Sequence, residues 1–301
     1  MSGCERLLAI EAPEPPADFE SFWRARRERA MRVVPKPKLR DTGADRGSWR
    51  VFELSYSSTD RVRVKGWLLL PKSGAAKRGF VIGHGYSGRT EPDVHFPFHD
   101  AALLFFCARG LGLTRHSTIS SDPAWHVLHD IQDRDRYVLG GCVDDVWCGV
   151  GTLLRLCPEA AGHVGYLGIS FSGGIGAMAL PWEERVQRAH FNVPTFGNQP
   201  LRLKIPSTGS ARSVQSFARR HPKALETLAY YDAATAARFL RQPVHFACAQ
   251  ADPAVAPEGQ FSIYNAAPGG KALFPLTGGH PTPVAEEREL LREIDTFFRD
   301  L

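Results

Sequence analysis

One short segment, residues 164–179, constrains the fold and the chemistry of this chain more than any other. It reads VGYLGISFSGGIGAMA: an apolar run ends in Gly168, Ser170 follows two residues later, and a stretch of small residues begins at once. A strand that turns sharply through a serine into a helix is typical of a nucleophile elbow, whose glycines let strand and helix approach closely. Ser172 stands where the pattern G-x-S-x-G has its second glycine, and serine is small enough to fit there. The segment predicts that Ser170 is a nucleophile; the alternative is a glycine-rich turn without chemistry.

An acid and a histidine follow Ser170 in the order expected for a catalytic triad. Asp252 comes shortly after the apolar run 243–249 and is followed by Pro253 and Pro257. His280 follows the short run 272–276 and two glycines, which let a loop bring the imidazole back over the sheet. We therefore expect Ser170 to attack the substrate, His280 to transfer the proton, and Asp252 to orient and stabilise the imidazole. Taken alone, Asp252 and His280 are also typical of an ordinary turn and loop.

A third segment supplies the donors that such a mechanism needs. Residues 80–88 read FVIGHGYSG, a buried strand that runs into a His-Gly-aromatic loop. An oxyanion hole uses the backbone N–H after the nucleophile and a second one from an early loop at a strand end. We predict that these are the N–H groups of Phe171 and Tyr86. His84 is expected to support this loop rather than to act as the catalytic base.

Further motifs are distributed over nearly the whole chain. They are DFESFW at 18–23, GWLLLP at 66–71, HGY at 84–86, RGLG at 109–112, ETLAYYD at 226–232, and the spacing from Asp252 through Pro257 to Tyr264 and Asn265. In these features the chain resembles the acetyl xylan esterase / cephalosporin C deacetylase family, which is carbohydrate esterase family seven of the α/β-hydrolases. The resemblance implies an α/β-hydrolase fold, with the triad at Ser170, Asp252 and His280 and the oxyanion N–H groups at Tyr86 and Phe171.

The chain departs from that family's pattern beside the expected active site. Phe171 and Ser172 stand where the family has glutamine and glycine, and the stretch from Arg109 to Tyr137 is short. Residues 127–133, VLHDIQD, replace a T-R-G motif near a tyrosine-rich segment. These departures concern the substrate range rather than the reaction.

Helical and β-like runs alternate along the chain, which favours a mostly parallel central sheet flanked by helices. The expected helices lie at 18–32, 141–156 and 173–180, and the expected strands at 49–56, 62–70, 80–83, 103–108, 164–167 and 188–193. We expect a single α/β-hydrolase domain over residues 1–301. An N-terminal helical extension at 1–48 and a helical insertion at 198–238, before the strand that leads to Asp252, complete the expected organisation. Such an insertion caps the site or forms a subunit contact.

Composition and charge argue against a nucleic-acid or membrane protein. The 301 residues include 37 basic and 32 acidic side chains with the signs interspersed, and the densest basic run, 24–29, is typical of a solvated helix face. No run approaches the roughly 18 apolar residues that cross a membrane. The six cysteines form no C-x-x-C motif and indicate free thiols in a reducing compartment. The N-terminus shows no signal-peptide pattern, and we expect a cytoplasmic protein.

Neither a metal nor another cofactor is expected. His95 and His99 are four residues apart, but Pro97 between them prevents a helical pair. His126 and His129 lack a third ligand, and no H-E-x-x-H motif occurs.

The sequence as a whole predicts a serine carboxylesterase that removes small acyl groups from alcohol oxygens of small-molecule esters. The family resemblance specifies acetyl groups. It also implies a homo-oligomer, a hexamer built from dimers whose active sites face an internal cavity. Two alternatives stay open: another hydrolase activity, such as that of a peptidase, thioesterase or lactonase, and a non-catalytic binding relative.

Overall fold

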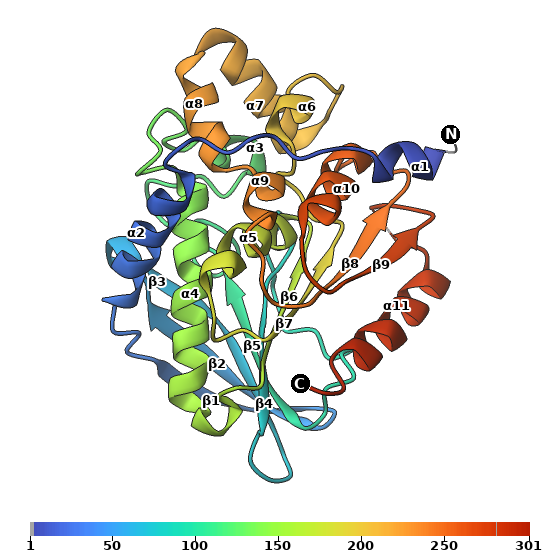
Figure 1. Ribbon diagram of the computed structural model, residues 1–301. Coiled ribbons are helices and arrows are strands. Elements are labelled where there is room, and N and C mark those ends of the chain that lie inside the picture. The colour runs from blue at the N-terminus through green and yellow to red at the C-terminus, as the bar shows by residue number, and fades with distance from the viewer. Residues whose placement is uncertain (1–2, 281) are drawn as a thin grey trace.

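A single nine-stranded sheet forms the centre of the computed structural model, which describes residues 3–280 and 282–301 (Figure 1). The strands are β1 (Lys38–Arg46), β2 (Trp49–Ser57), β3 (Arg63–Pro71), β4 (Arg78–Ile82), β5 (Ala101–Cys107), β6 (Val164–Ile169), β7 (Arg188–Asn192), β8 (Val244–Ala249) and β9 (Lys271–Leu276). They lie in the order β1-β2-β3-β5-β4-β6-β7-β8-β9. Pairing is antiparallel from β1 to β5 and parallel from β5 to β9. The sheet is mostly parallel, as predicted.

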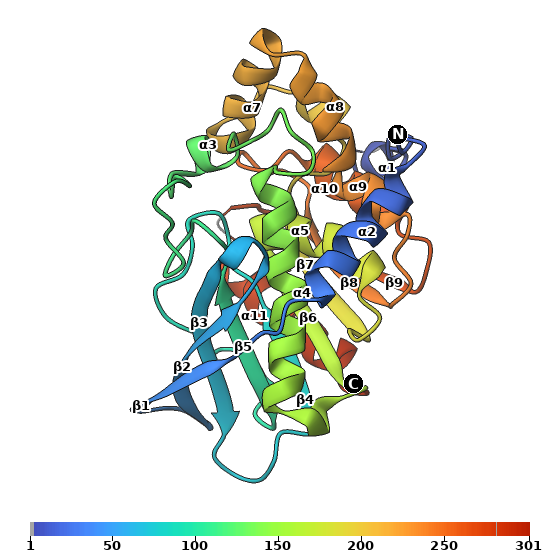
Figure 2. The same ribbon diagram turned by 90° about the vertical axis from the view of Figure 1, so that its left-hand side faces the viewer.

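Helices cover both faces of the sheet (Figures 1 and 2). They are α1 (Gly3–Leu8), α2 (Phe19–Met31), α3 (Pro123–His126), α4 (Val138–Leu156), α5 (Phe171–Ala179), α6 (Gln199–Arg202), α7 (Gly209–Arg220), α8 (Lys223–Tyr230), α9 (Ala233–Ala237), α10 (Pro257–Ala266) and α11 (Val284–Phe297). Helices α4, α5 and α10 pack on one face over the larger apolar core, and α11 packs on the other face over the smaller one. Both views show α7 and α8 projecting at one end of the molecule. No helix among the described residues is long and apolar enough to span a membrane.

Strand β5 shows how the sequence encodes the centre of the sheet. It reads AALLFFC, and all seven of its residues are buried. A continuous apolar run without alternation is typical of a strand covered on both faces. The two faces of β5 accordingly contribute to the two different cores.

The N-terminal segment corrects one expectation. Residues 1–48 were expected to be a helical extension, but Lys38–Arg46 forms the edge strand β1, paired with β2. Nearly every residue of β1 is exposed, so the strand carries no apolar alternation by which a sequence pattern would reveal it. In the expected insertion at 198–238, the structure has helices α6 to α9.

Two arginine–aspartate pairs are buried along α4. Arg109 Nη2 lies 2.7 Å from Asp145 Oδ1, and Arg26 makes two hydrogen bonds of 3.0 Å with the Asp144 carboxylate. The helix has a glycine at the point where Arg109 reaches it: a Cβ on Gly141 would lie 2.3 Å from Arg109 Nη1. Each pair compensates the buried charges of its two side chains. A buried charge without a partner would strongly destabilise the fold.

Four histidines are also buried: His84, His126, His190 and His245. His190 and His245 face each other across β7 and β8 with their Nδ1 atoms 2.8 Å apart. Burial lowers the pKa of His84, His126 and His245 to about 4 and holds the pKa of His190 well below its ordinary value. These side chains are therefore neutral in the folded protein at neutral pH.

We expect acid to destabilise the fold before the carboxylates titrate. The histidines of the unfolded chain bind protons below about pH 6.5, whereas those of the folded chain do so only near pH 4. The free energy of unfolding therefore decreases as the pH is lowered from about 6.5 to about 4. Each such shift corresponds to about 3 kcal/mol over the full window. Urea unfolding between about pH 7 and about pH 5 measures the slope. An unfolding free energy that stays constant over that range would contradict the assignment.

Candidate active site

Ser170 lies in a sharp turn between β6 and α5. Its backbone has φ 52° and ψ −108°, a conformation that side-chain-bearing residues rarely adopt. The turn is held from both sides: the Ser170 N–H donates to the Asn192 carbonyl at 2.8 Å, and the Ser170 carbonyl accepts from Thr195 at 3.1 Å. The side chain is partly exposed. The predicted nucleophile thus occupies a strained, well-supported turn at a strand end.

Two glycines make this turn possible. A Cβ on Gly168 would lie 2.3 Å from the Ser172 carbonyl oxygen, and a Cβ on Gly174 would lie 2.1 Å from the Thr195 carbonyl oxygen. Both contacts are to backbone atoms, which cannot move aside as a flexible side chain can. Strand β6, helix α5 and the segment after β7 therefore pack at distances that only glycine permits.

Ser172 has a different role from Ser170. It is fully buried, and its hydroxyl donates to the His84 carbonyl at 2.7 Å, while its backbone N–H reaches the same oxygen at 3.2 Å. Ser172 therefore ties the loop after β4 to the start of α5. This contact explains why a serine stands at the second glycine position of the pattern.

Asp252 and His280 are brought together by neighbouring strands. Asp252 follows β8, His280 follows β9, and the two strands are parallel, so their carboxyl ends meet at one edge of the sheet. His280 Nδ1 lies 2.7 Å from Asp252 Oδ2. Because a carboxylate only accepts, this contact places a proton on Nδ1 and leaves Nε2 as the basic nitrogen.

The Asp252 carboxylate is kept ionised by its hydrogen bonds. Burial raises the pKa of this carboxyl, but the hydrogen bond from His280 and the backbone N–H groups of Val255 and Ala254 outweigh burial, and the pKa lies below its ordinary value. The two N–H groups lie 3.1 and 2.8 Å from Asp252 Oδ1. The imidazole is therefore oriented by a carboxylate that is charged at neutral pH.

The other imidazole nitrogen is enclosed but unpaired. His280 Nε2 is buried and has no hydrogen-bond partner among the described residues, so it makes no bond to Ser170 Oγ there. In resting enzymes the bond between nucleophile and base is often long and closes only when substrate binds. The structure thus brings Asp252 and His280 into direct contact and places Ser170 two strands away, at the end of β6.

Gln260 is a contributor that the sequence analysis did not single out. Its Nε2 donates to Asp252 Oδ2 at 3.2 Å and to the Val255 carbonyl at 2.8 Å, and its Oε1 accepts from the Ala249 N–H at 2.8 Å. The side chain is fully buried on α10. The sequence did contain a signal for this role: a glutamine on the apolar face of the helix that begins at Pro257.

The two predicted oxyanion donors lie at the ends of adjacent strands, β4 and β6. Phe171 opens α5, and the first N–H groups of a helix have no partner within it. Among the described residues the Tyr86 N–H also makes no backbone hydrogen bond. The rings of Tyr86 and Phe171 are in contact, with centroids 4.5 Å apart. His84 supports this loop: its Nε2 accepts from the Ala108 N–H at 2.9 Å and its Nδ1 donates to the Gly85 carbonyl at 2.6 Å.

The Tyr86 side chain is anchored by His126. The Tyr86 hydroxyl lies 3.0 Å from His126 Nδ1, and His126 Nε2 lies 2.9 Å from the Arg109 carbonyl oxygen. Because that carbonyl only accepts, His126 donates through Nε2 and accepts the tyrosine hydroxyl through Nδ1. His126 is therefore a buried support of the loop that carries Tyr86, rather than a metal ligand.

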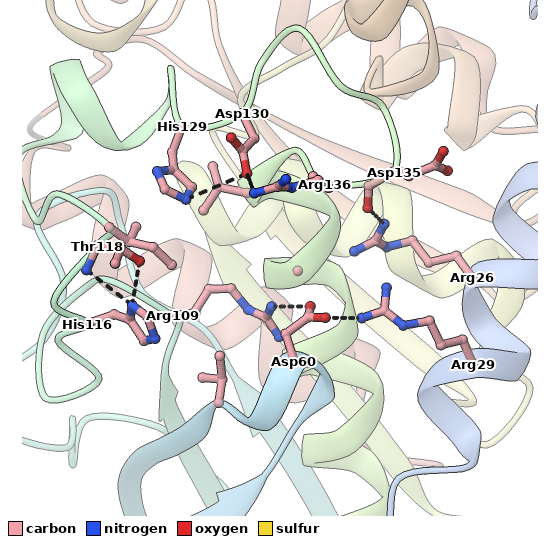
Figure 3. A pocket seen from close by; sticks show the side chains of 14 residues that line it. Arg26, Arg29, Asp60, Arg109, His116, Thr118, His129, Asp130, Asp135 and Arg136 are labelled. Atoms are coloured by element: carbon pink, nitrogen blue, oxygen red, sulfur yellow. Dashed lines mark hydrogen bonds and ion pairs between the residues drawn. The ribbon is translucent and has the colours of Figure 1, made fainter.

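A separate cavity of about 440 Å³ is lined by charged side chains (Figure 3). Figure 3 shows Asp60 between Arg109 and Arg29; Arg109 Nη1 lies 3.2 Å from Asp60 Oδ2. Arg26 in the same wall is paired with Asp144. Because these arginines already face carboxylates, and because none of Ser170, Asp252 and His280 lines this cavity, we do not place the reaction there.

The chain is similar to known proteins over nearly its whole length. Residues 10–278 match the model of the acetyl xylan esterase (AXE1) family. The acetyl xylan esterase from Paenibacillus sp. R4 has a TM-score of 0.88 at 19% identity, covering 97% of this chain and 99% of that one. Acetyl xylan esterase 1 from Thermoanaerobacterium sp. JW/SL YS485 has a TM-score of 0.83 at 18% identity, covering 98% and 97%.

The fold extends to a second class of enzyme. The acylaminoacyl peptidase of Pyrococcus horikoshii has a TM-score of 0.64 at 14% identity, with 84% of this chain covering 42% of the peptidase. These likenesses establish the predicted α/β-hydrolase fold. Since the family model spans almost the entire chain, the protein belongs to the acetyl xylan esterase (AXE1) family and is a carboxylic ester hydrolase.

Proposed function

We propose that the protein removes acetyl groups from small-molecule esters by a Ser-His-Asp mechanism, with Ser170 as nucleophile, His280 as base and Asp252 as the orienting acid. The contact between His280 Nδ1 and Asp252 Oδ2 at 2.7 Å is the observation that carries the proposal. It leaves Nε2 free to take the proton of a serine, and the strained turn at Ser170 supplies such a serine at the same edge of the sheet. Membership of the acetyl xylan esterase family supports the choice of an acetyl ester.

The reaction runs through an acyl-enzyme. Ser170 Oγ attacks the carbonyl carbon of the ester while His280 Nε2 takes the hydroxyl proton. The N–H groups of Tyr86 and Phe171 stabilise the negative charge that develops on the carbonyl oxygen. His280 then protonates the departing alcohol, leaving an acetyl group on Ser170. Water, deprotonated by His280, attacks this ester, and acetate leaves as Ser170 regains its proton.

The setting of this activity is also proposed. We place the enzyme in the cytoplasm, because all six cysteines are free and five of them are buried, as in proteins of a reducing compartment.

Small acetylated alcohols, among them acetylated antibiotics of the cephalosporin type, are the proposed substrate class. A panel of acetyl, longer acyl, thioester, lactone and peptide substrates tests this choice. If substrates of any other class are turned over faster than the acetyl esters, the proposed acetylesterase activity is wrong.

The two serines of the turn separate the proposed nucleophile from its neighbour. Ser170→Ala is expected to abolish hydrolysis of 4-nitrophenyl acetate, because the attacking oxygen is removed. Ser172→Gly is expected to keep substantial activity, since Ser172 only ties the loop after β4 to α5. Mass spectrometry after treatment with a serine-directed fluorophosphonate locates the modified residue. Labelling at Ser172 rather than Ser170 would refute the assignment.

Asp252 and Asp232 offer a second comparison. Asp252→Asn is expected to lower turnover by about 10³- to 10⁴-fold while the fold stays intact, because the imidazole loses its orienting anion. Asp232 accepts backbone N–H groups from Asn198, Gln199, Ala234 and Thr235. Asp232→Asn should therefore lower the unfolding free energy, by about 1–3 kcal/mol, with little change in turnover. Steady-state kinetics and urea unfolding of both variants measure this, and the reverse pattern would show that the wrong carboxylate was chosen.

We further propose that the protein assembles into a homo-oligomer, a hexamer. The nine-residue edge strand β1 is almost wholly exposed, and such an edge is a template for pairing with another chain. Trp125 (65% exposed) and Val34 (54%) add apolar surface. Light scattering at micromolar concentration is expected to give a mass well above that of one chain. A monomeric mass would contradict the proposal and would make polymeric acetylated xylan a more accessible substrate.

A further inference from the structure

An arginine of the 198–238 segment stands beside the proposed oxyanion residues. Arg202 ends α6, and its guanidinium carbon lies 5.1 Å from the centroid of the Phe196 ring. The Phe196 ring in turn contacts the rings of Phe171 and Tyr86, with centroids 5.9 and 6.3 Å apart. The positive charge of Arg202 is therefore separated from the proposed oxyanion loop by a single aromatic side chain.

Arg202 also lines a narrow cleft, which Ser170, Asp252 and His280 do not themselves line. The same cleft is lined by Thr195, Ala254 and Val255. The Thr195 N–H donates to the Ser170 carbonyl, and the N–H groups of Ala254 and Val255 donate to the Asp252 carboxylate. The walls of the cleft are thus continuous with the backbone that holds the nucleophile and the acid.

Arg202 makes no direct ion pair with a carboxylate among the described residues. Its one side-chain hydrogen bond runs from Nη1 to Gln199 Oε1 at 3.4 Å. Arg26, Arg109 and Arg89, by contrast, each contact a carboxylate directly. Asp232, the acidic residue whose charge acts on Arg202, is itself engaged by four backbone N–H groups.

An anion at this position would gain a strong interaction. Burial lowers the pKa of Arg202, yet a guanidinium stays protonated in proteins at neutral pH. A charged group that has lost part of its hydration and has no carboxylate in direct contact binds an opposite charge more strongly than one exposed to water. With Nη1 turned to Gln199, the edge formed by Nε and Nη2 matches the two oxygens of a carboxylate.

We propose that Arg202 binds a carboxylate on the alcohol part of the substrate, so that the enzyme prefers acetyl esters of hydroxy acids to those of neutral alcohols. This inference rests on the proposed function, because it assigns the alcohol to the Arg202 side of the same site. The acetyl group has no position for a charge, which leaves the alcohol as the part that carries it.

Two matched esters test the proposal. The first, 3-acetoxybenzoate, carries a carboxylate, and the second, 3-acetoxybenzamide, is neutral and of the same shape. In R202M the ratio of kcat/KM for the anionic ester to that for the neutral ester is expected to fall about 10- to 100-fold, the range for a hydrogen bond to a charged group. The change should appear mainly in KM. R202K, which keeps the charge but not the planar fork, is expected to retain part of the preference.

A control variant removes the same charge elsewhere. Arg212 is exposed on α7 and does not line the cleft, so R212M should keep the wild-type ratio. A fall in both R212M and R202M would indicate attraction by the overall charge and would overturn the proposal. Equal losses for both esters in R202M would show that Arg202 only packs on Phe196, and would overturn it as well.

A binding measurement separates this proposal from the proposed function. Calorimetry with the product 3-hydroxybenzoate requires no turnover, and R202M is expected to bind it about 10- to 100-fold more weakly than wild type does. If neither ester is hydrolysed but this difference appears, the acetylesterase proposal fails and the carboxylate site stands. If the neutral ester is hydrolysed through Ser170 and R202M binds the product as wild type does, the carboxylate site fails and the esterase stands.

Discussion

The left-handed turn at Ser170 is the constraint on which the rest of the site depends. A backbone in this region costs about 1–3 kcal/mol and persists only where its surroundings hold it. Here this conformation is held by Asn192, at the end of β7, and by Thr195, in the segment that follows it; both bond the serine backbone. The glycines at 168 and 174 let that segment and α5 approach to backbone contact. The same segment continues into α6, so the backbone that holds the proposed nucleophile runs directly into the 198–238 helices.

Much of this site was predictable because its signals are local. An apolar run, a glycine and a serine mark the turn at Ser170 within a few residues, and the order of the chain places Asp252 and His280 at the ends of later strands. The hydrogen bonds of Gln260 and His126 were not predictable in the same way, since their partners are chosen by the packing of helices on the sheet. Strand β1 was not predicted for a third reason. It is an exposed edge strand whose position is specified by pairing with β2 rather than by burial.

Arginines illustrate what a sequence alone does not distinguish. Arg109 and Arg202 are the same residue type, yet their electrostatic situations differ. Arg109 meets Asp145, 36 positions further along the chain, in a buried pair that stabilises the loop before α3. Arg202 meets an aromatic ring and an amide. Only the folded chain shows which charge has a partner, and therefore which one is available to a substrate.

Different parts of the structure carry the proposed reaction and the proposed choice of substrate. Ser170, Asp252 and His280 stand at the ends of sheet strands, where backbone hydrogen bonds and glycine contacts leave little freedom. The loop that carries Tyr86, however, is supported from outside the sheet: Tyr86 bonds His126, which immediately precedes the stretch 127–133. That stretch is joined to α4 through the Tyr137 hydroxyl, which donates to the Val127 carbonyl. Under the proposed function, changes in this outer layer and in the 198–238 helices would reshape the surroundings of the alcohol, while the strand ends that carry the proposed triad stay in place.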